Sequence, residues 1–223
     1  MIVAQTGDID WSWVNDRWAL VGEKFVEHAT LTVLAVGIGF LISFPVGVYA
    51  YRHRGVYTPV TLVTGMLYTI PSLAAFALLL PFTGLSLLTV LIPLVSYTLL
   101  ILIRNTVAGF NSVPADTKEA ALGMGFTSRE LLWRVELPLA LPVILTGVRI
   151  ATVTIIGLVT VAALVGRGGL GYFILLGFDQ FRGEALLTGS ILSVVFAVTM
   201  DALLVLAERA ATPWSRRKAM RSL

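Results

Sequence analysis

Long apolar stretches separated by short polar ones make up most of the 223-residue chain. A helix of about 20 apolar residues is long enough to cross a hydrocarbon core of about 30 Å. The stretches that reach this length lie near residues 29–50, 59–80, 86–109, 142–165 and 186–208. The pattern therefore predicts an all-α integral membrane protein, built as a helical bundle of five spans.

Before the first span, aromatic and aliphatic residues recur at helical spacing, and the charged residues fall elsewhere. The residues of this apolar face are Trp11, Val14, Trp18, Val21 and Phe25. Such a helix is expected to lie in the membrane interface, although a contact surface for a partner would have the same pattern. The expected organisation is an external interfacial segment over 1–27, a membrane domain over 28–209 and a basic cytoplasmic tail over 210–223.

Composition agrees with the membrane class, and the distribution of charge predicts an orientation. Apolar residues make up 57% of the chain, charged residues only 13%, and the formal net charge is +3. Basic residues gather after the first, third and fifth spans and are sparser on the other side. Because Lys and Arg are enriched on the cytoplasmic side of membranes, we expect the N-terminus outside and the C-terminus in the cytoplasm.

A long polar stretch, residues 111–138, lies between the third and fourth spans. Gly123 and Gly125 can take the left-handed backbone conformation that ends a first helix. Residues 127–130 have the pattern of a capping box that starts a second helix. Leu137-Pro138 is expected to close that helix, because the residue before a proline is driven out of the α region. The prediction is two short helices around a glycine bend.

The spacing within this stretch resembles the signature loop of permease subunits of binding-protein-dependent ABC importers. Glu-Ala-Ala is followed after three residues by Gly125, and after nine more by Val135, one residue and Leu-Pro. The alternative is an ordinary cytoplasmic loop. The resemblance implies a bundle of the type I, methionine-permease-like kind, whose loop docks on a cytoplasmic ATPase. The residues it assigns to this coupling are Asp116, Glu119, Ala120, Ala121, Gly123, Gly125, Leu137 and Pro138.

Pro71 interrupts the second predicted span. A proline inside a helix frees backbone groups, which must bond to neighbouring groups or face a water-lined cavity. The break is therefore either part of a solute pathway or a packing kink. The candidate pathway residues are Tyr68, Pro71, Ser72, Phe76 and Tyr97.

Arg104, Arg149 and Asp201 are ionisable residues inside predicted spans, at one depth of about 8–10 Å from the cytoplasmic ends at about 1.5 Å per residue. A lone charge at that depth is costly, whereas an arginine–carboxylate pair is tolerated. We expect Asp201 to join the fifth span to Arg149 of the fourth or Arg104 of the third. The pair would either clamp the helices together or form part of an ion or proton path.

The segment 166–171 matches the dinucleotide-binding fingerprint Gly-x-Gly-x-x-Gly letter for letter. That fingerprint needs a preceding β-strand in a soluble βαβ unit. Here it follows a membrane-length apolar run, so we expect an external loop in which Gly166, Gly168, Gly169 and Gly171 let the backbone fold tightly.

Features that would supply chemistry or energy are missing from the sequence. No lysine follows a glycine, which excludes a phosphate-binding loop of the Gly-Lys-Ser/Thr type. Two histidines and no cysteine offer no metal site, and no serine lies in a hydrolase elbow. We therefore expect a non-catalytic chain that binds no metal or cofactor, with ATP and Mg²⁺ on a separate ATPase subunit.

Further segments look like the osmoprotectant branch of the importer permeases, which takes up glycine betaine, choline or carnitine. They are residues 68–74, 135–145 and 168–171. The resemblance implies an ATPase pair, a second permease that is identical or homologous, an external solute-binding protein, and a bacterial or archaeal plasma membrane. Alternatives are a related importer for methionine or another small solute, and an ATP-independent secondary transporter, which should have inverted repeats.

Overall fold

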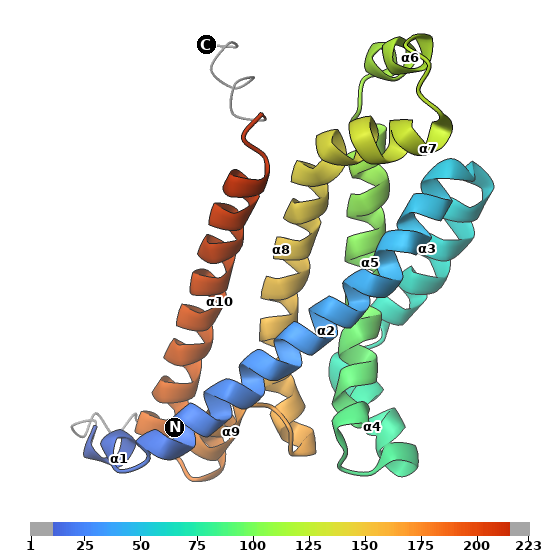
Figure 1. Cartoon of the computed structure of the whole chain (residues 1–223). Helices are drawn as coiled ribbons and strands as arrows, with labels where there is room; N and C mark the ends of the chain where they lie inside the picture. The colour runs from blue at the N-terminus through green and yellow to red at the C-terminus, as the bar shows by residue number, and fades with distance from the viewer. Residues whose placement is uncertain (1–10, 215–223) are drawn as a thin grey trace, which may run out of the picture.

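A computed structural model describes residues 11–214, and none of these residues forms a β-strand (Figure 1). In chain order the α-helices are α1 (Ser12–Asn15), α2 (Trp18–Arg52), α3 (Arg54–Thr69), α4 (Ser72–Thr83), α5 (Leu87–Asn111), α6 (Ala115–Gly123), α7 (Ser128–Glu130), α8 (Leu137–Val161), α9 (Gly171–Asp179) and α10 (Gly183–Ala211). The π-helix η1 (Leu131–Glu136) precedes α8, and the 3₁₀-helix η2 (Ala162–Val165) follows it. The predicted all-α class is confirmed.

Within residues 11–214, four helical segments are each long and apolar enough to cross a membrane without a break. They correspond to the first, third, fourth and fifth predicted spans. The second predicted span is the pair α3 and α4, which are bent by 88° relative to each other. The bend follows Ile70, whose extended backbone (ψ 126°) ends α3 immediately before Pro71. The interruption expected at Pro71 is therefore present.

Helix α2 begins earlier than the sequence suggested. It runs for 35 residues from Trp18, so it crosses the expected boundary at residues 27 and 28 without a break. From Trp18 onward the amphipathic segment and the first span are therefore one helix, because no strong helix breaker lies between Trp18 and the first span. At about 1.5 Å per residue, α2 is about 52 Å long and must tilt to fit a hydrocarbon core of about 30 Å. Figure 1 shows it running obliquely across α5 and α8.

The core lies where α2, α4, α5 and α8 meet. Leu31, Phe76, Leu94 and Ile155 are each at most 1% exposed there and belong to one cluster. Small residues let the helices approach closely, as expected where lipid gives no hydrophobic drive. A Cβ on Gly47 of α2, for example, would lie 2.7 Å from the side chain of Thr106 on α5. By contrast, only 11% of the most apolar stretch of α10 is buried.

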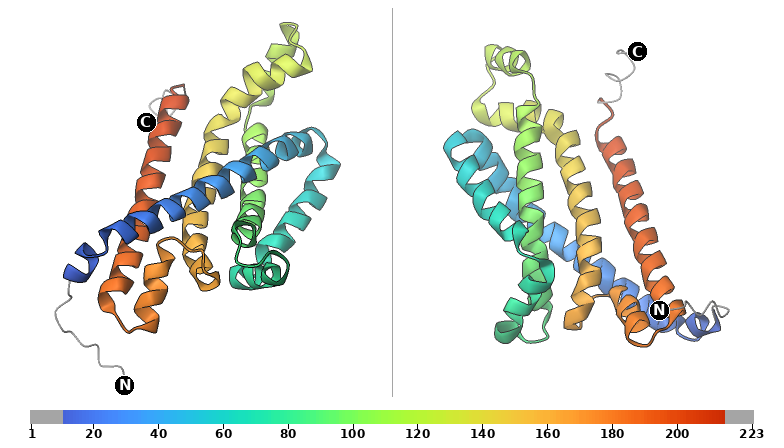
Figure 2. Two further views of the ribbon diagram at one scale, coloured as in Figure 1. Left: turned by 60° about the horizontal axis from the view of Figure 1, so that its bottom comes forward. Right: turned by 180° about the vertical axis from the view of Figure 1, so that it is seen from behind.

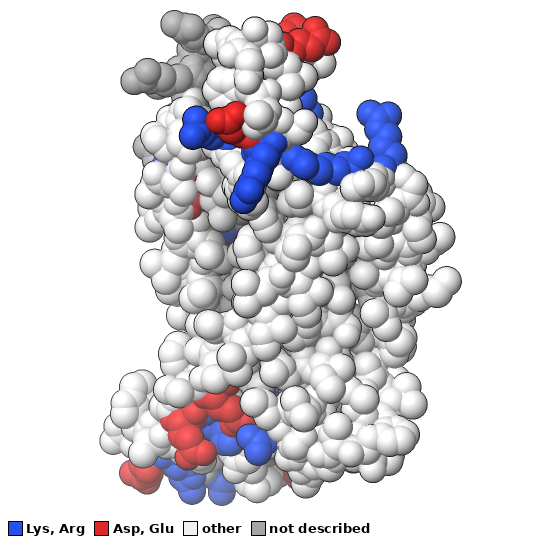
Figure 3. Space-filling model, turned by 45° about the vertical axis from the view of Figure 1, so that its right-hand side comes forward, with Lys and Arg blue, Asp and Glu red and all other residues white. Residues whose placement is uncertain are grey.

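Charged side chains gather at the two ends of the face shown in Figure 3, with a broad uncharged belt between them. One end carries α6, α7 and the close of α10, and we call it the hairpin end. The other carries the start of α2, the turn from α4 to α5, and α9 with the loop before it. We call this the glycine-loop end (Figures 1 and 2). The uncharged belt is the part of the surface suited to lipid.

Candidate functional site

The polar stretch 111–138 folds as a hairpin that projects beyond the ends of the neighbouring helices (Figure 1). Its first helix, α6, ends in a Schellman motif around Gly125, which has φ 87°. The Phe126 amide donates to the Ala121 carbonyl at 3.2 Å, and the Gly125 amide donates to the Leu122 carbonyl at 2.9 Å. Gly125 thus makes the predicted bend, whereas Gly123 remains helical as the last residue of α6.

The predicted capping box at the start of the second helix is present. The Thr127 amide donates to Glu130 Oε2 at 3.1 Å, and the Glu130 amide donates to Thr127 Oγ1 at 3.3 Å. The box fixes where the chain turns from the glycine bend into α7.

The expected end of the second helix at Leu137-Pro138 is wrong. Helix α7 passes into the π-helix η1 and then directly into α8, which begins at Leu137 and includes Pro138 in its first turn. A proline lacks an N–H and crowds the preceding turn, and a wider π turn relieves that conflict. The second helix of the hairpin is therefore continuous with the fourth span.

Several residues assigned to coupling form an exposed face on α6. Asp116, Glu119, Ala120 and Gly123 are exposed, whereas Ala121 is buried at 2%. Leu122 and Met124 add apolar surface, with exposed fractions of 50% and 71%. An exposed helix with two acids and large apolar side chains is suited to docking on another protein. Leu137 and Pro138 are half-buried at the base of the hairpin.

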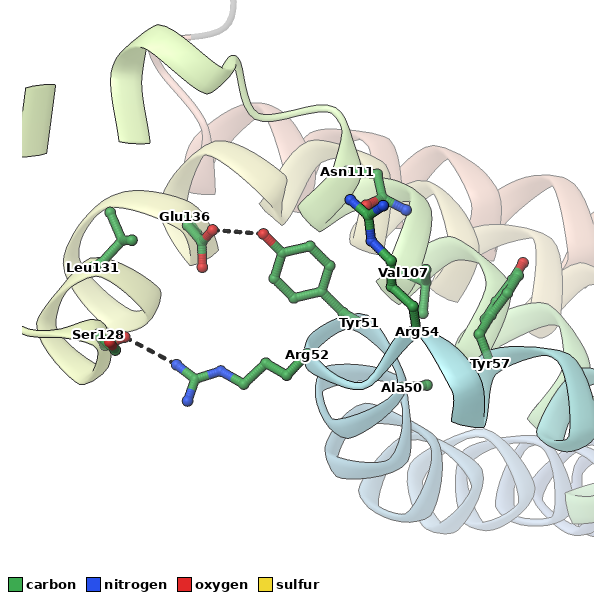
Figure 4. Close-up of a pocket in the computed structure, with 10 residues that line it drawn as sticks. All are labelled: Ala50, Tyr51, Arg52, Arg54, Tyr57, Val107, Asn111, Ser128, Leu131 and Glu136. Carbon is green, nitrogen blue, oxygen red and sulfur yellow. Dashed lines mark hydrogen bonds between the residues drawn. The ribbon is translucent and has the colours of Figure 1, made fainter. Parts of the chain in front are cut away.

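A cleft of about 790 Å³ lies beside the hairpin, between the end of α2, the start of α3, α5 and α7 (Figure 4). On its wall, Tyr51 Oη donates to Glu136 Oε1 at 2.6 Å and accepts from Lys118 Nζ at 2.8 Å. Arg52 Nη2 donates to the Ser128 carbonyl at 2.9 Å. Sequence analysis predicted none of these contacts, because the paired residues are 67 to 85 positions apart and follow no periodic pattern.

The candidate pathway residues meet at the break between α3 and α4, with one exception. Tyr97 Oη donates to the Ile70 carbonyl at 2.6 Å, which satisfies an acceptor that the break leaves outside the helix. The rings of Tyr68 and Tyr97 pack edge to face with centroids 5.9 Å apart. Pro71 is exposed and Ser72 half-buried. Phe76, by contrast, is fully buried in the core and does not reach the surface of the chain.

Of the two expected pairings of Asp201, the one with Arg149 is present. Arg149 Nε and Nη2 donate to the two Asp201 carboxylate oxygens at 3.0 and 3.1 Å, and Nη1 lies 3.4 Å from Glu208 Oε2. The fork geometry is the strong bidentate form of such a pair. Among residues 11–214 no contact between Arg104 and Asp201 is found, and the Arg104 side chain is exposed. The pair ties α8 to α10.

The glycine segment 166–171 folds as a tight loop, and it does not follow a β-strand. Gly166 and Gly169 have φ of 82° and 51°. A Cβ on Gly168 would collide with the Ala163 backbone, and one on Gly171 with the Thr160 carbonyl. These contacts match the predicted tight fold and give no support to a dinucleotide site.

His28, at 0% exposure, holds this loop to two helices. Its Nδ1 accepts from the Leu170 amide at 3.3 Å, so its Nε2 donates to the Ile156 carbonyl at 3.1 Å. A Cβ on Gly169 would lie 2.5 Å from the His28 side chain and 2.7 Å from its backbone. Sequence analysis considered His28 only in excluding a metal site; a lone histidine in an apolar segment was the available signal.

Comparison with known proteins gives consistent matches. Residues 35–213 match the model of the family described as "Binding-protein-dependent transport system inner membrane component". The choline transport system permease protein OpuBB of Bacillus subtilis is 35% identical over 85% of this chain and 88% of its own. The osmoprotectant import permease protein OsmW of Salmonella typhimurium is 37% identical, over 86% and 92%. The glycine betaine/carnitine/choline permease OpuCD of Bacillus subtilis is also 37% identical, over 93% and 91%.

Solved structures agree on the fold. An inward-facing structure of the MetNI methionine ABC transporter superposes with a TM-score of 0.80 at 24% identity, covering 88% of this chain and 98% of that one. An amino acid ABC transporter crystallised with histidines gives a TM-score of 0.69 at 19% identity, over 92% and 100%.

Proposed function

Because the chain belongs to the binding-protein-dependent transport system inner membrane component family, we propose that it is the permease subunit of an ABC importer for an osmoprotectant. Relatives named for choline, carnitine or glycine betaine transport, at 33–37% identity over 85–94% of the chain, support this solute class. The observation that carries the importer assignment is the exposed α6 face of the hairpin. The chain itself is not an enzyme in this proposal.

The proposed partners follow from what the chain lacks. A cytoplasmic ATPase pair binds ATP and Mg²⁺ and supplies the energy, and an external binding protein delivers the solute. A second permease, identical or homologous, completes the pore, since oligomers of membrane subunits are usually symmetric or nearly so. Asp116, at the first turn of α6, and Glu119 would face basic groups of the ATPase, with Leu122 and Met124 in its groove.

In the proposed cycle, ATP closes the ATPase pair and displaces α6. The hairpin continues into α8 through η1 without a break, so the displacement passes into the bundle and changes which side of the pore is open. The break at Ile70 and Pro71, with Tyr68 beside it, is the proposed place where solute meets the wall of the pathway. Aromatic faces suit a quaternary ammonium group.

The proposed orientation places the hairpin end in the cytoplasm and the glycine-loop end outside. The basic residues after the first, third and fifth spans support it. The N-terminus would then be outside and the C-terminus inside, in the plasma membrane of a bacterium or archaeon.

The test is reconstitution with the cognate ATPase and binding protein in liposomes. We expect ATP-dependent uptake of radiolabelled glycine betaine, choline or carnitine, and an ATPase that co-purifies with this chain. Calorimetry of the binding protein with these solutes and with methionine identifies the solute. Binding of methionine alone would replace the osmoprotectant by the alternative solute, and uptake without ATP would overturn the importer assignment.

Changing Gly125 to aspartate should uncouple transport from ATP hydrolysis. A side chain at its positive φ costs about 1–2 kcal/mol, which is too little to unfold the protein but enough to redirect the hairpin. We expect the variant to reach the membrane and the ATPase to remain active, while uptake falls about tenfold, since about 1.4 kcal/mol is tenfold in an equilibrium. Gly55→Asp, at an exposed glycine in the first turn of α3, is the matched control. Wild-type uptake by Gly125→Asp would remove the hairpin from the mechanism.

A further inference from the structure

Four helical elements meet in a small polar cluster at the base of the hairpin. We call Tyr51 of α2, Lys118 of α6 and Glu136 of η1 the Tyr51 cluster, and its floor is Phe110 of α5. The Tyr51 and Phe110 rings are stacked, with centroids 5.1 Å apart and planes at 21°. In Figure 4 the Tyr51 side chain extends from the end of α2 directly toward Glu136.

The three polar groups form a closed ring of contacts. Lys118 Nζ donates to Tyr51 Oη at 2.8 Å and to the Phe110 carbonyl at 3.2 Å, and it lies 3.4 Å from Glu136 Oε1. Tyr51 Oη donates in turn to the same carboxylate oxygen at 2.6 Å. The Glu136 side chain is only 6% exposed. A buried carboxylate is tolerated only when it is paired and hydrogen-bonded, so Glu136 depends on both Lys118 and Tyr51.

The position of the cluster gives it a mechanical consequence. Lys118 lies on α6, between the exposed acids Asp116 and Glu119, and it points away from them into the protein. Tyr51 lies at the end of α2, the helix that runs the length of the bundle and crosses α5 and α8. A displacement of α6 would therefore be transmitted to α2 through the ring of contacts. This connection is separate from the direct continuation of the hairpin into α8.

We propose that Tyr51, Lys118 and Glu136 are positioning residues that fasten α6 to α2, so that one displacement of the hairpin moves α2 and α8 together. The proposal rests on the proposed function, and it predicts that a permease without the cluster hydrolyses ATP with its partners but moves less solute. Arg52, which bonds the Ser128 carbonyl on α7, braces the same junction from the exposed side.

The first test is Tyr51→Phe in the complete reconstituted transporter. This change removes one oxygen and keeps the stacked ring. Because hydrogen bonds to charged groups are among the stronger ones, we expect the number of solute molecules imported per ATP hydrolysed to fall about tenfold, with the stimulated ATPase rate within about twofold of wild type. Tyr49→Phe, two residues earlier on an exposed part of α2, is the matched control and should leave the ratio unchanged.

The second test separates positioning from stability. Lys118→Met and Glu136→Gln each leave one charge of the pair without an opposite charge. The double variant removes both charges but does not restore the ring of contacts. A positioning role predicts a low import ratio in all three, even where the double variant melts like wild type. Recovery of the import ratio along with stability in the double variant would overturn the proposal, as would a wild-type ratio in Tyr51→Phe.

A distance measurement reports the fastening directly. The sequence has no cysteine, so spin labels at Ala115→Cys on α6 and Gly55→Cys at the start of α3 have no background. We expect one narrow distance distribution in the otherwise unchanged protein and a broader one with Tyr51→Phe. If Tyr51→Phe fails to assemble, Lys118→Met, which removes the donor, takes its place in both assays, and an unchanged import ratio and distribution width overturn the proposal. Because wild type must transport in the same liposomes, failure of the proposed function is seen separately, as absent uptake by wild type.

Discussion

The two ends of the molecule are held together by different kinds of contact. At the glycine-loop end, the backbone of segment 166–171 lies directly on the backbone of α8, η2 and α2, with no room for a Cβ at Gly168, Gly169 or Gly171. At the hairpin end, α2 meets the hairpin through side chains: Phe44 and Val48 pack against the apolar cluster that includes Leu132, and the polar side chains of the Tyr51 cluster join the two elements.

This difference bears on which end can move. A backbone-to-backbone contact cannot lengthen without losing both van der Waals contact and hydrogen bonds, because packed interiors have no slack. Side-chain contacts cross several rotatable bonds and can re-form after a shift. Helix α2 takes part in both junctions, through His28 at one end and Tyr51 at the other, about 35 Å apart along the helix. We therefore expect α2 to stay in place at the glycine-loop end and to be able to shift at the hairpin end.

The largest effect is expected from a change that disrupts the backbone contact at the glycine-loop end. Gly169→Ala adds a Cβ that would lie 2.5 Å from the His28 side chain, at a residue whose φ is 51°. Overpacking costs about 1–3 kcal/mol and the left-handed backbone about 1–2 kcal/mol more. We expect a loss of about 3 kcal/mol or failure to assemble, measured by thermal unfolding in detergent through tryptophan fluorescence.

The control for this variant is Gly157→Ala on α8, where a new Cβ would meet no atom within 4 Å. Gly157→Ala should melt at or slightly above the wild-type temperature, since alanine favours helices. Equal melting of the two variants would contradict the close backbone contact at the glycine loop.

A smaller effect is expected between the ends, where α10 meets α8. Near the glycine-loop end α10 packs closely, since a Cβ on Gly189 would lie 2.8 Å from the Leu170 carbonyl on the loop and from Ile174 on α9. Further along, the Arg149–Asp201 pair holds α10 to α8, with side chains 27% and 39% exposed. The pair has the bidentate fork geometry, so we expect a coupling energy of about 1–2 kcal/mol between Arg149→Met and Asp201→Asn.

Thermal unfolding of the two single variants and the double variant measures that coupling. Thr154→Ala is the control, because Thr154 lines a cleft together with Arg149 and Asp201 but its hydroxyl donates to the Ile150 carbonyl of its own helix. Strictly additive losses for Arg149→Met and Asp201→Asn would show that the pair does not hold the helices together, and that α10 depends on its contacts at the glycine-loop end alone.

Sequence patterns predicted the features that short-range physics determines. Apolar length marked the spans, Pro71 marked the break, and the left-handed turn at Gly125 and the capping box at Thr127 follow from local backbone geometry. The Arg149–Asp201 pair could be predicted because a lone charge inside the membrane is costly and is usually paired. The exposed face of α6 is carried by residues that the loop resemblance had assigned.

The features that sequence analysis missed depend on contacts between distant residues or on the absence of a stop signal. Nothing in the local sequence links Tyr51 to Glu136, 85 positions away. Likewise, His28 bonds a loop 142 positions away. Pro138 was read as an end because a proline breaks an ordinary α-helix, whereas the π turn before it lets the helix continue. Helix α2 extends back to Trp18 because no strong helix breaker separates the later part of the amphipathic pattern from the apolar span, whereas the part before Asp16 forms the separate helix α1.

The smallest expected effect tests the hairpin end within a single turn of helix. Thr127→Ala removes the side chain that accepts the Glu130 amide at 3.3 Å, and loss of such a cap costs about 1 kcal/mol. Because the next element is held by Arg52 and the Tyr51 cluster, we expect the start of α7 to fray without altering the melting temperature of the bundle. Hydrogen exchange should accelerate about fivefold at the amides of residues 129–131, as about 1 kcal/mol predicts.

Ser128→Ala is the control, since the contact made there with Arg52 uses the backbone carbonyl. Equal exchange in the two variants would mean that the turn is fixed by the glycine bend and the side-chain junction, and not by its cap.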